Sequence, residues 1–152
     1  MSYYDRFKKL TEAEEIERDQ ILFGTYNPEE YSGGVRSFSR VAPEAIATLI
    51  EKGYADPDEE QNNSPCIQEF LDFCEQHPLV KYTLSGYTVS REREDCRVSV
   101  DQIFGILEMP KEDASIAEVI EEILAFYERF RYADDVEVAK DGDNLVFYAW
   151  YD

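Results

Sequence analysis

Residues 115–131 show the clearest separation of apolar and polar positions in the chain. At 100° per residue, their large apolar side chains gather on one helical face, with acids and Arg129 opposite. The apolar positions are Ile116, Val119, Ile120, Ile123, Phe126, Tyr127 and Phe130. Ser115 and Glu118 have the spacing of a capping box, which predicts that the helix begins there. We expect the apolar face to pack against a sheet.

A β-hairpin is predicted to follow this helix. Val136 and Val138 mark a short first strand. Asp141 and Gly142 are typical of a tight turn, and residues 145–151 are rich in β-branched and aromatic side chains. Both faces of this return strand are apolar, which favours an inner position in the sheet.

The first half of the chain is predicted to be mostly helical. Thr11 and Glu14 form another capping box, and Pro43 suits a first helical position. The expected helices cover residues 3–10, 11–23, 43–52 and 64–76, with an irregular loop over 24–37. Two strands, 82–90 and 96–103, come next, and Gly86 is a candidate for a β-bulge.

This order of elements predicts an α+β fold. N-terminal helices precede a β-β-α-β-β unit, whose mainly antiparallel sheet is covered by the 115–131 helix. The 152 residues suffice for one domain, without a linker-like stretch. We expect a single domain over 1–152, with 1–79 mostly helical and 80–152 containing the sheet.

The formal net charge of −19 is the extreme feature of the composition. Residues 41–80 contain nine acids and one base, and residues 111–152 contain twelve acids and four bases. Such a surface repels phosphates and anionic lipids, so direct binding to nucleic acid or membranes is disfavoured. A basic protein partner is the natural expectation, although acidic surfaces also simply promote solubility.

Two groups of acids are the candidate binding residues. One group follows the solvent face of the 115–131 helix and its end, and the other occupies an acidic loop. The groups are Glu118, Glu121, Glu122, Asp134 and Asp135, and Asp56, Asp58, Glu59 and Glu60.

The location is expected to be cytoplasmic. No apolar run reaches the roughly 18 to 20 residues of a membrane span, and the first ten residues do not resemble a signal peptide. Cys66, Cys74 and Cys96 are odd in number and lack paired spacing, which favours reduced thiols.

Catalytic and metal signatures are weak. His77 is the only histidine, so a catalytic triad or a multi-histidine metal centre is excluded by count. Zinc at Cys74 and His77 lacks further ligands at a suitable spacing, and the 141–144 turn lacks the ligand spacing of an EF-hand calcium loop. Gly33 and Gly34 are not in a phosphate-loop context. No catalytic, cofactor-binding or metal residue is therefore assigned.

Three functional classes remain open. We favour a non-enzymatic binding module for a basic protein, such as an inhibitor, an immunity-type protein or a DNA mimic. An alternative is a hydrolase-type enzyme that uses a carboxylate cluster or the 24–37 loop. The helix-helix-hairpin order over 43–104 also permits a winged-helix-like assembly subunit, but a DNA-reading role is disfavoured because its second helix has three acids and no base.

Overall fold

The computed structural model describes residues 3–110 and 115–152. In chain order its elements are the 3-10 helix η1 (Tyr3–Arg6), α1 (Glu12–Phe23), the 3-10 helix η2 (Pro28–Glu30), β1 (Val35–Val41), α2 (Pro43–Glu51), α3 (Ile67–Gln76), β2 (Lys81–Val89), β3 (Arg97–Glu108), α4 (Ile116–Arg129), β4 (Asp135–Asp141) and β5 (Asn144–Trp150). The described strands form one antiparallel sheet in the order β1-β2-β3-β5-β4. The predicted α+β fold and the inner position of β5 are confirmed. Within the described ranges, every helix is too short or too polar to cross a membrane.

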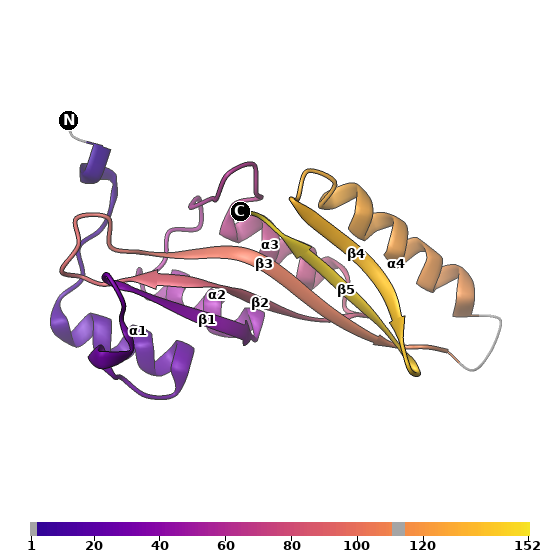
Figure 1. The fold of residues 1–152 in the computed structure, drawn as a ribbon, viewed down its shortest axis with the longest axis horizontal. Helices are drawn as coiled ribbons and strands as arrows, with labels where there is room; N and C mark the ends of the chain where they lie inside the picture. The colour runs from indigo at the N-terminus through magenta and orange to yellow at the C-terminus, as the bar shows by residue number, and fades with distance from the viewer. Residues whose placement is uncertain (1–2, 111–114) are drawn as a thin grey trace.

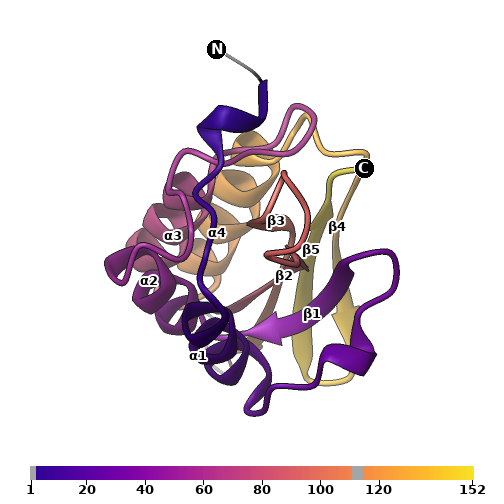
Figure 2. The same ribbon diagram turned by 90° about the vertical axis from the view of Figure 1, so that its left-hand side faces the viewer.

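The helices α1, α2, α3 and α4 all lie on one side of the sheet (Figures 1 and 2). The opposite side, which we call the open face, carries no α-helix in the described part of the chain. Successive side chains of a strand point to opposite faces of the sheet, and the pairing register shows which residues of neighbouring strands share a face. Together they identify the residues of β2, β3, β5 and β4 whose side chains lie on the open face. They are Lys81, Thr83, Ser85, Gln102, Phe104, Ile106, Glu108, Asn144, Val146, Tyr148, Trp150, Asp135, Glu137, Ala139 and Asp141.

Helix starts agree with the sequence prediction in part. The capping box of Thr11 and Glu14 is present at α1. At α4 the predicted box is wrong, because Ser115 has helical backbone angles and its side chain caps no N–H. At α3 the N-cap is Cys66, two residues beyond the predicted start at Ser64, because the Ser64 hydroxyl instead accepts from the N–H of Gln61.

Strand β1 corrects the prediction of an irregular loop over 24–37. Its residues Val35 to Phe38 pair with β2, and Phe38 is buried in the core. The strand was missed because polar residues occupy most of its positions, and an edge strand needs few apolar side chains. Strand β3 also continues to Glu108, five residues past the predicted end at Ile103.

Helix α4 buries only part of its predicted core face. Val119, Phe126 and Phe130 are buried, whereas Ile116 is 42% exposed and Ile120 is 50% exposed. The exposed positions continue through Leu124 and Tyr127 along one side of the helix. The prediction of one fully buried face was wrong because α4 lies at the end of the helix layer, where it has a neighbouring helix on one flank only (Figure 1).

An aromatic cluster attaches α4 to the sheet. Phe126 stacks on Tyr82 at a centroid distance of 5.9 Å and meets Phe147 edge-on at 5.4 Å. Gly105 on β3 pairs with both Tyr82 and Phe147, and a Cβ at Gly105 would lie 2.5 Å from the Tyr82 ring. The absent side chain therefore makes the space in which these rings pack.

A buried charge network attaches α1 to the end of β2. The side chain of Arg18 is 0% exposed, and its guanidinium donates to Asp19 Oδ1 at 3.0 Å and to the carbonyl oxygen of Val89 at 3.1 Å. It also donates to the Tyr31 hydroxyl at 2.9 Å. Such a network was not predicted, because arginine and aspartate normally remain solvated unless they pair in the interior.

We expect Gly86→Ala to lower the free energy of unfolding by about 3 kcal/mol, because a Cβ there would overlap the backbone carbonyl of Ser99. Gly105→Ala is also expected to destabilise the protein, by about 2 to 3 kcal/mol, because its Cβ would overlap the buried side chains of Tyr82 and Val80. Urea unfolding monitored by circular dichroism measures both. Ser37→Ala, at an exposed position of β1, is the control. A cost for Gly86→Ala no larger than that of the control would contradict the close approach of β2 and β3.

Candidate functional site

The acids predicted on α4 do not form one uniform strip. Glu118 and Glu121 are exposed on the helix layer. Glu122 is half-buried, and its Oε2 lies 2.9 Å from His77 Nδ1. His77 is thereby explained as the partner of Glu122 at the end of α3.

The loop acids also differ among themselves. Asp56, Asp58 and Glu60 are exposed, whereas Glu59 is only 5% exposed and lies between Arg97 and Arg6. Burial raises the pKa of Glu59, and the two guanidinium groups oppose this shift. Glu59 therefore has a structural role among these acids.

The two acid-rich regions meet at the C-terminal residue. Asn62 in the acidic loop donates to the carbonyl oxygen of Asp152, at 3.2 Å. The N–H of Asp152 donates to Asp134 Oδ2, at 2.7 Å. The structure thus brings the loop beside the start of β4, although the regions are more than 70 residues apart in the sequence.

Near Asp152 and the start of β4, the open face combines aromatic rings with carboxylates. Across the sheet, Asp135 pairs with Trp150, and Trp150 pairs with Gln102. In the next row, Glu137 pairs with Tyr148, which pairs with Phe104. Directly paired residues place their side chains next to each other on the same face. Trp150 and Tyr148 therefore lie between carboxylates of β4 and side chains of β3.

A β-bulge adds another carboxylate. The register of β2 and β3 shifts between Ser85 and Gly86, as the glycine predicted, and the extra residue on β3 is Asp101. Because Val100 and Ile103 both belong to the core, Asp101 and Gln102 between them point away from it. Asp101 was not among the predicted site residues, although a charged residue within an otherwise β-rich run is a signal for a bulge.

The Asp101 carboxylate is half-buried without a compensating charge. Within the described residues, only its own backbone amide stabilises the charged form. Burial raises the pKa of Asp101 to about 6. An unpaired and partly desolvated carboxylate favours the approach of a cation or a hydrogen-bond donor.

We define the Trp150 patch as Asp101, Asp135, Glu137, Tyr148 and Trp150. Burial raises the pKa of the Tyr148 hydroxyl, and the charges of Asp135 and Asp101 raise it further, so both carboxylates lie within electrostatic reach of this ring. Two bases also reach the open face. Lys81 lies on β2, and the Arg40 guanidinium stacks at 3.8 Å over Phe104, the strand neighbour of Tyr148. The patch is an aromatic surface that carries three carboxylates, with the Arg40 charge beside it on the β3 side.

The other sequence candidates have structural explanations. Residues 141 to 144 form the turn between β4 and β5, and residues Gly33 and Gly34 precede β1 with positive φ angles. Cys66, Cys74 and Cys96 are unpaired thiols. Within residues 3–110 and 115–152, no group of three histidine, cysteine or acidic side chains is arranged to hold a metal ion.

No protein-family model, curated protein sequence or solved structure matches this chain.

Asp101→Asn is expected to stabilise the protein at pH 7.5 by about 1 kcal/mol, a value reduced for partial solvent exposure. The pKa rises from 3.8 in the unfolded chain to about 6 in the folded one, so the carboxylate destabilises the fold as pH rises through this range. At pH 3.5 the carboxyl is mostly protonated in both states, so most of the gain should be lost. Urea unfolding at pH 7.5 and pH 3.5 tests this. Asp143→Asn, at an exposed turn position, is the control, and an equal gain at both pH values would contradict the expectation.

Trp150 is the single tryptophan, so its fluorescence reports the field of the patch. At low ionic strength, caesium ions should quench it about twofold more efficiently in the wild type than in an Asp101→Asn/Asp135→Asn variant, and iodide should show the reverse. Stern–Volmer constants measure both effects, and acrylamide, which is neutral, controls for accessibility. An identical caesium-to-iodide ratio in the two proteins would show that these carboxylates do not set the field at Trp150.

Proposed function

We propose that this chain is a non-enzymatic protein-binding module that docks a basic protein on the Trp150 patch. The observation that carries the proposal is the half-buried, uncompensated Asp101 carboxylate, which lies within electrostatic reach of Tyr148 and precedes Gln102, the strand partner of Trp150. A lysine or arginine of the partner would supply the missing charge, and hydrogen bonds from charged donors to carboxylates are among the strongest in proteins.

The composition of the patch supports a protein ligand. Protein interfaces are enriched in tryptophan and tyrosine at the centre, with charged residues at the rim. Trp150 and Tyr148 occupy the centre here, and Asp135 and Glu137 are exposed beside them. Arginine also stacks favourably on aromatic rings, so the same partner side chain can contact Trp150 and Asp101 together.

The electrostatics favour a basic protein over nucleic acid or a membrane surface. The net charge of −19 repels phosphates and anionic lipid head groups, and it accelerates association with a positively charged protein. An inhibitor, an immunity-type protein or a DNA mimic would have these properties. The unpaired cysteines support a cytoplasmic location.

A salt-graded pull-down from lysate tests the proposal. The immobilised wild type should retain a basic protein at about 50 mM salt and release it by about 500 mM, because screening weakens the attraction. Retention should be weaker at pH 5 than at pH 7.5, since protonated Asp101 attracts no cation. Trp150→Ala and Asp101→Asn/Asp135→Asn should each reduce retention by at least about tenfold, the loss expected for removing a central aromatic contact or charge-assisted hydrogen bonds.

The matched control is Glu118→Gln/Glu121→Gln, which removes the same number of charges from α4. It should retain the partner nearly as well as the wild type. If this control reduces retention of the partner as much as the patch variants do, only the net charge matters, and the Trp150 patch is not the binding site. If the wild type retains no basic protein, the proposed function is wrong.

A further inference from the structure

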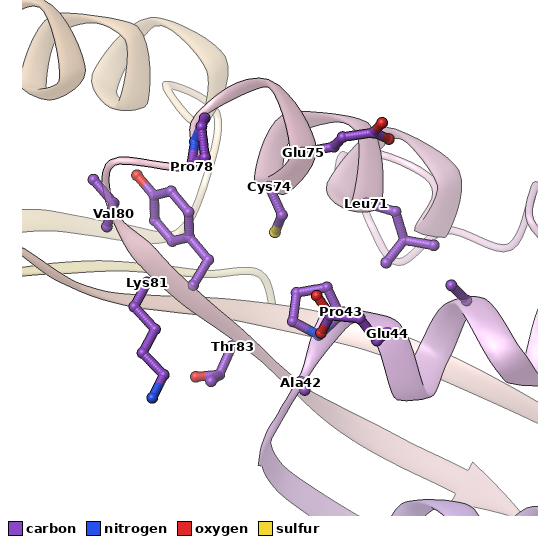
Figure 3. Close-up of a pocket in the computed structure, with 12 residues that line it drawn as sticks. Ala42, Pro43, Glu44, Leu71, Cys74, Glu75, Pro78, Val80, Lys81 and Thr83 are labelled. Atoms are coloured by element: carbon purple, nitrogen blue, oxygen red, sulfur yellow. The ribbon is translucent and has the colours of Figure 1, made fainter.

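A groove opens on the opposite edge of the molecule from β4, between the start of α2, the end of α3 and strand β2 (Figure 3). Its volume is about 580 Å³, within the range of natural ligand sites. Leu71, Cys74 and Val80 line it with apolar surface. Figure 3 shows Leu71 and Cys74 directed from α3 toward Pro43 on α2.

The groove exists because β1 ends before β2 does. The last pair between these strands is Val41 with Leu84. Two residues later Pro43 begins α2, and proline has no N–H with which to continue the ladder. On this side, no strand of the described chain pairs with β2 between Lys81 and Thr83.

The register shows which backbone groups face the groove. The N–H of Ser90 donates to the carbonyl oxygen of Gly34, on the β1 side of β2. In an antiparallel ladder the backbone groups of alternate residues point to the same neighbour. Even-numbered residues of β2 therefore face β1, and Tyr82 directs its N–H and C=O toward the groove. The neighbouring Lys81 and Thr83 direct theirs toward β3.

We propose that this groove binds an extended peptide segment of a partner protein, which pairs with the backbone of Tyr82 and inserts one large apolar side chain between α2 and α3. An unpaired strand edge beside an apolar cleft is the arrangement that recognises peptides by strand addition. The peptide lies beside β2, in the position that β1 would take if that strand continued beyond Pro43.

The residues that line the groove indicate which peptide side chains it favours. Burial raises the pKa of Cys74 to about 12, so this thiol stays neutral and behaves as an apolar surface. Glu44 and Glu75 are exposed at the rim, and Lys81 is the one base among the lining residues. Together with the net charge of −19, these acids favour lysine or arginine on either side of the apolar residue.

The groove and the Trp150 patch are separate sites. The groove lies at the β2 edge beneath α2 and α3, whereas the patch lies on the open face of β5, β4 and β3. The peptide proposal goes beyond the proposed function and does not depend on it, because it requires neither Trp150 nor Asp101.

A displayed library of random octapeptides, selected on the wild-type protein at low salt, tests the groove. Enriched peptides should share one large apolar residue flanked by lysine or arginine. Ala47→Trp fills the groove from an exposed position of α2, and it should weaken binding of the enriched peptide by at least about tenfold. Glu51→Trp, on the same helix outside the lining, is the matched control and should bind normally, as should Trp150→Ala.

Strand addition is tested on the wild-type protein by amide hydrogen exchange. In the free protein the Tyr82 amide should exchange faster than those of Lys81 and Thr83, and the peptide should slow it by at least about tenfold. N-methylation of the peptide's apolar residue should abolish this protection. The proposal is overturned if no peptide is enriched, if Ala47→Trp binds as tightly as Glu51→Trp, or if the peptide leaves Tyr82 exchange unchanged.

Discussion

The packing of Phe126 against the rings of Tyr82 and Phe147 is the contact on which the arrangement of the sheet depends. It holds α4 against the same face that α2 and α3 cover, and the missing side chain of Gly105 leaves room for the Tyr82 ring. Burying such aromatic side chains contributes on the order of 1.5 to 3 kcal/mol each. With the apolar faces of the described helices directed to one side of the sheet, the other side remains available for contact (Figure 2).

The two proposed sites follow from this one-sided packing. On the open face, Trp150 remains half-buried, and the bulge holds the half-buried carboxylate of Asp101 within electrostatic reach of the adjacent Tyr148. Functional sites commonly retain groups that destabilise the fold, because the partner then supplies the missing interaction. At the β2 edge, Pro43 ends the ladder and begins α2. Within the described part of the chain, Tyr82 therefore has no strand partner on that side, and an apolar groove lies beside it.

Local features of the fold were predictable from the sequence wherever one residue type dictates one conformation. The capping box at Thr11, the proline start of α2 and the hairpin turn at Gly142 are of this kind. The bulge at Gly86 belongs with them, because a side chain there would overlap the opposite strand. The candidate acids were predictable only as a class, since charge counts do not say which carboxylates remain unpaired.

Taken alone, the sequence determined the α+β class, the strand-rich C-terminal half and the strongly negative surface. Hydrophobic periodicity can be recognised within a short segment, and the net charge is a sum over residues, so neither requires knowledge of contacts between distant residues. Only the tertiary structure decided which apolar side chains of α4 are covered, since that depends on neighbouring elements. It alone also joined Asp134 to the acidic loop through Asp152, buried Arg18 and Glu59, and brought Asp101 within electrostatic reach of Tyr148. Each of these depends on contacts between residues far apart in the chain, which no local pattern encodes.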